Sequence, residues 1–272
     1  MDADGGRMTV RLPAVLHGES GERRALTEEV ACEAPLTLYV DGEEVVTLLC
    51  TPSDLEELVI GYLASEGVLR SARDIRWLAV DPERGEAFVV TVDGRGQGLA
   101  SRFAQRTIGA CCGKGRLSLY WQNDVATVKA LHGVGPVLSP ASARRVMAAL
   151  RRAAADDVFG RTGGVHDACL ARADGTILAR RADIGRHNAL DKLYGMSILR
   201  TLETGDLVAA VSGRVSSEVL LKVAKMGVAF LLSKSACTDL ALKLAGELGM
   251  TVVGFVRDGR LTVYTGEERI LG

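Results

Sequence analysis

The chain has 272 residues, 47% hydrophobic and only 4% aromatic, which predicts globular domains with cores of Ala, Val and Leu. The formal net charge of −1 excludes an overall field that recruits nucleic acid or a membrane surface. The start MDADGGRMTV is not a signal peptide, and no apolar segment approaches the roughly 20 residues that span a bilayer. We therefore expect a cytoplasmic protein with reduced cysteines.

The chain begins with a segment that lacks a clear pattern. Residues 1–25 are rich in Gly, Arg and Glu and predict a mobile tail with one short strand. Residues 26–120 predict a small α+β domain, in which Asp41 and Gly42 form a turn between two apolar strands. TPSDLEELVIGYLASEGVL then predicts a helix with Ser53 as its N-cap. Further strands are expected around IRWLAVD and EAFVVTVDG.

The stretch TIGACCGKG, residues 107–115, places Cys111 and Cys112 among three glycines at the far end of this domain. Adjacent cysteines rarely bond to each other because the small ring strains the disulfide. The glycines leave the sulfurs little covered, and the charges of Lys114 and Arg116 favour the reactive thiolate. The stretch therefore predicts either a reactive thiol loop or a surface turn with two incidental cysteines.

The second half of the chain alternates strands with helices. Residues 121–140 are weakly periodic and contain two prolines and two glycines, which predicts a linker. Residues 141–272 predict an α/β domain with a mostly parallel sheet, which begins with a helix capped by Ser139. The expected strands are a DACLARADGTILARR hairpin, LVAAVS, VAFLLS, TVVGFV and RLTVYTG, and the expected helices include RVSSEVLLKVAKMG and TDLALKLAGELG.

Two hydroxyl-rich loops, SGRVSSE and SKSACTD, each follow an expected strand and lead directly into a helix. Ligands of open parallel sheets bind beyond the carboxyl ends of the strands, and the amides at a helix start attract anions. We therefore expect a phosphate site here, where Arg214 or Lys234 would add charge. Ordinary helix capping by Ser216 and Thr238 is the alternative.

The densest polar cluster is RADIGRHNALDKL, residues 181–193. A helix that starts within it would place His187 and Asp191 on one face, either as a pair for proton transfer or ligand binding or as part of a charged surface. His166 adds a second histidine in a Gly-rich loop. A zinc deaminase needs a Glu two residues after its His and a downstream Pro-Cys-x-x-Cys. Ala168 occupies that Glu position and the sequence has no CxxC, so we expect no metal.

Together these motifs resemble the formate dehydrogenase accessory sulfurtransferase family, FdhD, over nearly the whole chain past the tail. The matching stretches are TPSDLEELVIGYLASEGVL, the cysteine loop, GGVHDA, DIGRHNALDKL, SGRVSSE, SKSACTDLA and GFVRDGRLTVYT. The resemblance implies that the second domain has the cytidine deaminase fold without its zinc machinery.

The resemblance also implies a sulfurtransferase that works as a sulfur carrier. Family members take persulfide sulfur from a cysteine desulfurase and pass it to the molybdenum of a bis-guanine-dinucleotide cofactor that formate dehydrogenase requires. They bind guanine nucleotides such as GDP, and a homodimer is plausible. By resemblance, Cys111 and Cys112 are catalytic. The residues expected to contact the cofactor are Phe255, Val256, Arg257, Asp258, Gly259, Arg260, Ser212, Gly213, Arg214, Ser216, His166 and His187.

One departure from the family leaves the position of the persulfide open. Many members carry C-G-x-C where this chain has GACC. A gapless alignment places Cys112 on the second family cysteine and Gly109 on the first, whereas a shortened spacing would match both cysteines. Two other functions are alternatives: a nucleotide-acting hydrolase that uses His166 and His187, and a chaperone that holds the molybdenum cofactor without passing sulfur.

Overall fold

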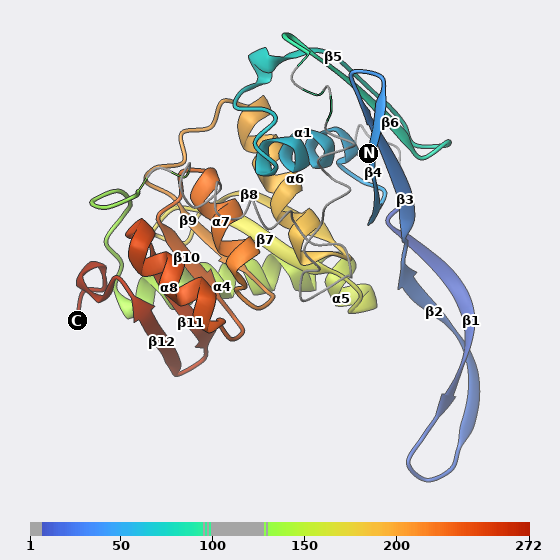
Figure 1. The fold of residues 1–272 in the computed structure, drawn as a ribbon. Helices are drawn as coiled ribbons and strands as arrows, with labels where there is room; N and C mark the ends of the chain where they lie inside the picture. Colours follow the sequence, from blue (N-terminus) through green and yellow to red (C-terminus); the bar gives the residue numbers. More distant parts are fainter. Residues whose placement is uncertain (1–6, 95, 97, 99–127, 129) are drawn as a thin grey trace.

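The structure is a computed structural model that describes residues 7–94, 96, 98, 128 and 130–272. The predicted thiol loop, with Cys111 and Cys112, lies outside these residues. The described part contains a two-stranded, a four-stranded and a six-stranded sheet. Figure 1 shows that α1 and α6 lie between the four-stranded and the six-stranded sheet. The two-stranded sheet projects away from both.

The four-stranded sheet forms a small α+β unit, as predicted. Its order is β4-β3-β6-β5, and α1 packs on it through Leu58 and Leu63, which meet Leu36 and Leu38 of the sheet. The unit is built from β3 (Ala34–Val40), β4 (Glu43–Cys50), α1 (Leu55–Ser65), η1 (Ala72–Asp74), β5 (Ile75–Asp81) and β6 (Glu86–Thr91). The predicted strands and the turn at Asp41 and Gly42 are confirmed.

The N-cap of α1 differs from the prediction. Asp54 occupies that position in a left-handed conformation, with φ 49°, and its side chain makes no capping bond. Ser53 is buried instead, and its hydroxyl accepts a hydrogen bond from Lys192 Nζ at 3.4 Å. A buried ammonium requires oxygen acceptors, so Ser53 serves a distant lysine rather than its own helix.

The prediction of a mobile tail with one short strand over residues 1–25 differs from the structure from residue 7 onward. β1 (Thr9–His17) pairs with β2 (Arg23–Ala31) in an antiparallel hairpin, from Thr9 opposite Ala31 to His17 opposite Arg23. Both strands are mostly exposed, so their sequence lacks the apolar alternation by which a half-buried strand is found. The hairpin meets α5 (Val158–Thr162) near its base, where Arg161 Nη1 lies 2.7 Å from Glu29 Oε1.

The six-stranded sheet, of order β12-β11-β10-β9-β7-β8, forms the second unit and confirms the α/β prediction. Its three central strands, β9, β10 and β11, are parallel, as expected. The β7–β8 hairpin and β12 add antiparallel pairs on either side. The strands are β7 (His166–Ala171), β8 (Ile177–Asp183), β9 (Val208–Val211), β10 (Phe230–Ser233), β11 (Thr251–Arg257) and β12 (Arg260–Thr265), followed by η2 (Glu267–Arg269).

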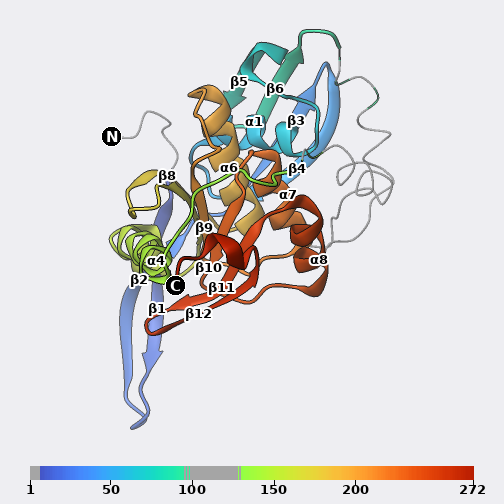
Figure 2. The ribbon, with the colours of Figure 1, turned by 90° about the vertical axis from the view of Figure 1, so that its left-hand side faces the viewer.

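Helices cover both faces of this sheet (Figures 1 and 2). One face packs against α6 (Arg186–Leu199), α7 (Ser217–Lys225) and α8 (Asp239–Leu248), and the other against α4 (Pro140–Ala155). Ser139 caps α4 as predicted, because its Oγ accepts the Ser142 amide at 3.1 Å. The loops that follow the parallel strands therefore emerge between two helical layers.

The two units meet where α1 lies against α6. A Cβ on Gly61 would be 1.7 Å from the Asp191 carbonyl oxygen, and a Cβ on Gly195 would be 1.9 Å from the Glu57 carbonyl oxygen. Only glycine allows the two backbones to approach this closely. Tyr194 packs against the cores of both units, so the units share one continuous interior.

Candidate functional site

Three loops meet at the carboxyl edge of the parallel strands. Ser233 Oγ, at the end of β10, donates to the Gly213 carbonyl at 2.7 Å, which joins the SKSACTD loop to SGRVSSE. Val215 and Cys237 extend this contact as a β-bridge. The Phe255 amide donates to the Ser235 carbonyl at 3.0 Å. The structure therefore brings the predicted SGRVSSE loop and the FVRDGR turn to one edge, on either side of SKSACTD.

His166 lies beside the first of these loops. Its Nδ1 is 3.4 Å from Ser212 Oγ, and a Cβ on Gly213 would be 3.4 Å from the same nitrogen and 3.2 Å from Arg186 Cδ. Burial lowers the pKa of His166, against the opposing charges of Asp167 and Asp183. A lowered pKa favours the neutral ring at neutral pH, so His166 is suited to hydrogen bonding rather than to carrying charge.

His187 and Asp191 do not form the pair that their spacing offered as one of two alternatives. His187 Nε2 lies 3.2 Å from Glu218 Oε2 of α7, whereas Asp191 is buried one turn further along α6, where it accepts from Ser65 Oγ at 2.6 Å and pairs with Lys222. The first turn of α6 lies at the carboxyl edge of the parallel strands, whereas the next turn is buried between α1 and α7. Residues four apart on one helix thus meet different surroundings.

The starts of α6 and α7 bring two guanidinium groups together. Burial and then the charge of nearby Arg214 lower the pKa of Arg186, partly offset by Glu218. Ser216 caps α7, with its Oγ accepting the Val219 amide at 3.4 Å. Capping leaves the other first-turn amides of α7 available to an anion. Arg186, which the sequence reasoning did not assign to the site, belongs to this cationic edge.

The other polar residues of DIGRHNALDKL join the two units rather than line the edge. Lys192 Nζ lies 2.7 Å from Asp183 Oδ2 and donates to the Thr51 carbonyl at 2.9 Å. Asn188 Nδ2 donates to the Leu49 carbonyl at 2.8 Å and to Asp183 Oδ1 at 2.9 Å. The densest polar motif is therefore mainly a structural joint.

The FVRDGR turn presents its residues unequally. Phe255 adopts φ 49°, which is unusual for a bulky residue, and the Arg257 guanidinium lies over its ring at 5.4 Å from the centroid. Val256 is buried in the core, so only its backbone is available to a ligand. Gly259 and Arg260 are exposed at the tip, and Asp258 Oδ1 accepts from Arg151 Nη2 at 2.7 Å.

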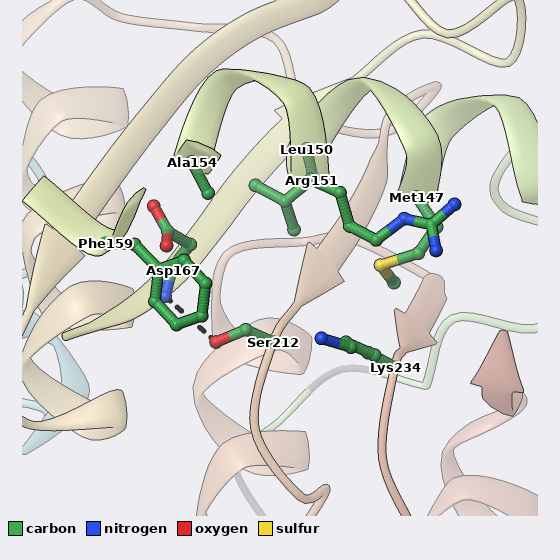
Figure 3. A pocket seen from close by; sticks show the side chains of 8 residues that line it. All are labelled: Met147, Leu150, Arg151, Ala154, Phe159, Asp167, Ser212 and Lys234. Carbon is green, nitrogen blue, oxygen red and sulfur yellow. Dashed lines mark hydrogen bonds between the residues drawn. The ribbon is translucent and has the colours of Figure 1, made fainter. Parts of the chain in front are cut away.

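A cavity of about 150 Å³ lies on the α4 side of this edge (Figure 3). Ser212 of the predicted loop lines it together with Lys234. Sequence reasoning missed its other polar residues, Asp167 and Arg151, although Asp167 directly follows His166 in the GGVHDA stretch. The residues that line the cavity are Met147, Leu150, Arg151, Ala154, Phe159, Asp167, Ser212 and Lys234.

Three of the four cysteines that the structure describes are poorly suited to thiolate chemistry. Burial, with the nearby charge of Asp183, raises the pKa of Cys50 to about 12, and burial raises the pKa of Cys169 to about 12. Burial also raises the pKa of Cys237 to about 11. Cys32 is half-buried. A thiol whose pKa is raised in this way carries little thiolate at neutral pH.

The described residues contain neither a cluster suited to a metal ion nor a helix suited to a membrane. No group of three or more His, Cys, Asp or Glu side chains within residues 7–94 and 130–272 is arranged to hold a metal ion. Nor does any helix that the structure describes have the length and apolar character needed to cross a membrane.

Comparison with known proteins identifies close relatives. Residues 31–271 match the model of the FdhD/NarQ family. The chain is 51% identical over 246 residues to the sulfur carrier protein FdhD of Geobacillus kaustophilus, covering 90% of each chain. It is 45% identical over 254 residues to that of Bacillus subtilis, covering 93% of this chain and 94% of the other. A crystal structure from Desulfotalea psychrophila, described as a formate dehydrogenase accessory protein, superposes with a TM-score of 0.77 at 24% identity over 97% of this chain and 100% of the other.

Proposed function

The chain belongs to the FdhD/NarQ family, and we propose that it is a sulfur carrier in the maturation of formate dehydrogenase. The observation that carries the proposal is the likeness to proteins named sulfur carrier protein FdhD, which extends over nine-tenths of both chains at up to 51% identity. Burial raises the pKa values of Cys50 and Cys169, which makes these two thiols poor candidates for the carrier cysteine. Cys111 and Cys112 are then the candidates, on the strength of their sequence surroundings.

The finer proposal is that this cysteine carries a persulfide received from a cysteine desulfurase. The thiolate of Cys111 or Cys112 attacks the outer sulfur of the donor's persulfide, so that a new S–S bond forms on the carrier. The donor's own S–S bond breaks, and its cysteine leaves as a thiolate. No oxidant or reductant is consumed in this exchange.

The substrate that receives the sulfur is proposed to be the molybdenum bis-guanine-dinucleotide cofactor. Its phosphates would lie on the cationic edge formed by Arg186 and Arg214 and the start of α7, where positive charge and free amides favour an anion. His166, which lies beside Gly213, and His187, which lies beside Glu218, would position the bound cofactor. We further propose that the protein is a cytoplasmic homodimer and that its partner is a formate dehydrogenase.

Sulfur loading tests the proposal directly. The protein is incubated with a cysteine desulfurase and radiolabelled cysteine, and we expect protein-bound label that a thiol reductant removes. Replacing Cys111 and Cys112 with Ser should abolish the label, and the two single variants would show which cysteine carries it. Cys50→Ser and Cys169→Ser are controls that should load normally. Label retained by the Cys111→Ser/Cys112→Ser double variant would rule out this loop as the carrier.

A further inference from the structure

The β1–β2 hairpin projects away from the other two sheets (Figures 1 and 2). It meets the rest of the described chain near its base, where Glu29 accepts from Arg161 Nη1 at 2.7 Å and a Cβ on Gly164 would be 3.1 Å from that of Ala31. Both strands are mostly exposed beyond this contact. Two paired strands are marginally stable in water without a further packing partner, so the hairpin is a candidate for contact with another chain.

The strand register sorts the side chains of the hairpin onto two faces. Directly opposed residues share a face and successive residues alternate, so Glu29 and Ala31 belong to the face that meets α5, together with Arg11, His17, Arg23 and Thr27. The other face, here called the outer face, carries an apolar strip. Its members are Val10, Leu12, Ala14, Leu16, Leu26 and Val30. Leu12, Leu16 and Val30 are 47%, 47% and 41% exposed, which is typical of an interaction surface.

The outer face also carries two charges of opposite sign, Arg24 and Glu28, both on β2. Arg24 lies opposite Leu16 and Glu28 lies opposite Leu12, so neither charge faces a counter-charge across the hairpin. Leu26 lies midway between the two charges along the strand. The charges are therefore equally distant from Leu26 and opposite in sign.

This arrangement is complementary to itself. If two outer faces pack together with their strands antiparallel, a two-fold axis at Leu26 places Arg24 of each copy against Glu28 of the other. Leu12 of each copy then meets Leu16 of the other, and the two Leu26 side chains meet at the axis. If the strands were parallel, β1 would lie on β2 and each charge would face a leucine instead.

We propose that the outer face of the hairpin binds the same face of a second copy of this chain, in the antiparallel arrangement. The assignment rests on the homodimer of the proposed function and names the surface that forms it. Face-to-face sheets pack about 10 Å apart with interdigitated side chains, which removes the apolar strip of both copies from water. Each strand of nine residues spans roughly 30 Å. The contact is therefore small, and small interfaces are typical of reversible complexes.

Charge reversal tests the arrangement. Analytical ultracentrifugation of the wild type over a range of concentrations should show an equilibrium of monomer and dimer. Arg24→Glu sets two carboxylates against each other at both symmetry-related contacts and should weaken the dimer about tenfold or more. Glu28→Arg should weaken it similarly through two guanidinium groups. Arg23→Glu, on the α5 face of the same strand, is the matched control and should dimerise as the wild type does.

A mixture of the two weakened variants distinguishes a direct contact from a damaged hairpin. Arg24→Glu and Glu28→Arg together restore both contacts with their signs exchanged, so an equimolar mixture should form a heterodimer at about the wild-type affinity. Leu26→Asp places two carboxylates at the axis and should leave a monomer. Failure of the mixture to associate, when thermal melting shows both variants folded, would overturn the assignment.

The same measurements separate this assignment from the proposed function. A wild-type dimer that persists unchanged in Arg24→Glu and Leu26→Asp would overturn only the assignment and leave the homodimer to another surface. A wild type that stays monomeric at every concentration would overturn the assignment and the homodimer together. Sulfur loading is measured on the same samples. Dimers that depend on the outer face but load no sulfur would overturn the carrier function and leave the interface standing.

Discussion

Lys192 and Asp183 form an ion pair that solvent does not reach: Nζ lies 2.7 Å from Oδ2, and both side chains are 0% exposed. Thr51 joins the pair from the first unit, since its carbonyl accepts from Lys192 and its amide donates to the other partner, Asp183, at 3.1 Å. The pair is thus satisfied by backbone from the opposite unit.

Lys192→Met should destabilise the protein by about 3–5 kcal/mol, because it leaves the Asp183 carboxylate buried without its counter-charge. Chemical denaturation measures the loss. Arg84→Ala removes a largely exposed pair with Glu86 and should cost about 1 kcal/mol or less. If the two variants lose similar stability, the buried pair does not have the role assigned to it.

Gly61→Ala should destabilise the protein by more than about 2 kcal/mol, because a Cβ there would be 1.7 Å from the Asp191 carbonyl and would force α1 and α6 apart. Gly246→Ala, in α8, has nothing within 4 Å of its added Cβ and should stabilise the protein by up to about 1 kcal/mol through helix propensity. Thermal melting of both variants checks the opposite signs. A neutral Gly61→Ala would show that the helices can separate at little cost.

His187→Ala should accept labelled sulfur normally but fail to activate formate dehydrogenase, because thiolate exchange needs no histidine whereas the proposed role of His187 is to position the cofactor. Glu218→Gln should show a milder form of the same defect, since it weakens the contact at 3.2 Å that orients the ring. His166→Ala should follow His187→Ala. Turnover of free nucleotides by the wild type, lost in His187→Ala, would instead favour the hydrolase alternative.

Asp191→Asn, in contrast, should act through stability, because this side chain pairs with Lys222 and accepts from Ser65. Its melting temperature should fall, while the sulfur loading of the folded fraction remains at the wild-type level. A folded Asp191→Asn protein with the His187→Ala defect would restore the expectation that the two residues work as a pair.

The thiols of Cys50 and Cys169 should resist alkylation at pH 8 in the folded protein, since burial raises the pKa of each from near 9 to about 12. Because the folded state favours the neutral thiol, the raised pKa makes the free energy of unfolding depend on pH. The contribution of each thiol to stability is fully present below pH 9 and is lost as pH rises from about 9 to 12. Mass spectrometry of a Cys111→Ser/Cys112→Ser protein would follow the labelling. Half-buried Cys32 should react first, and rapid modification of Cys169 at pH 8 would contradict the prediction.

The sequence predicted most of the fold because the central strands are short apolar runs, such as VAFLLS, and each leads through a short loop to a capped helix. It missed the β1–β2 hairpin, whose strands are mostly exposed and so lack an apolar alternation. It also left open a pairing of Asp191 with His187, because spacing along a helix does not reveal that Ser65 and Lys222 approach from elsewhere. Asp167 went unassigned because the sequence does not reveal that the preceding helices α4 and α5 fold over it to form a cavity.

The close crossing of α1 and α6 has a consequence for cooperativity. Tyr194 packs against both cores, and the backbones of α1 and α6 are in close contact at Gly61 and Gly195. Neither unit therefore has a complete interior without the other. We therefore expect one calorimetric transition rather than two, and a fragment that ends before residue 130 should fail to fold when expressed alone. The division of this chain into two units is one of topology, and its stability belongs to a single foldon.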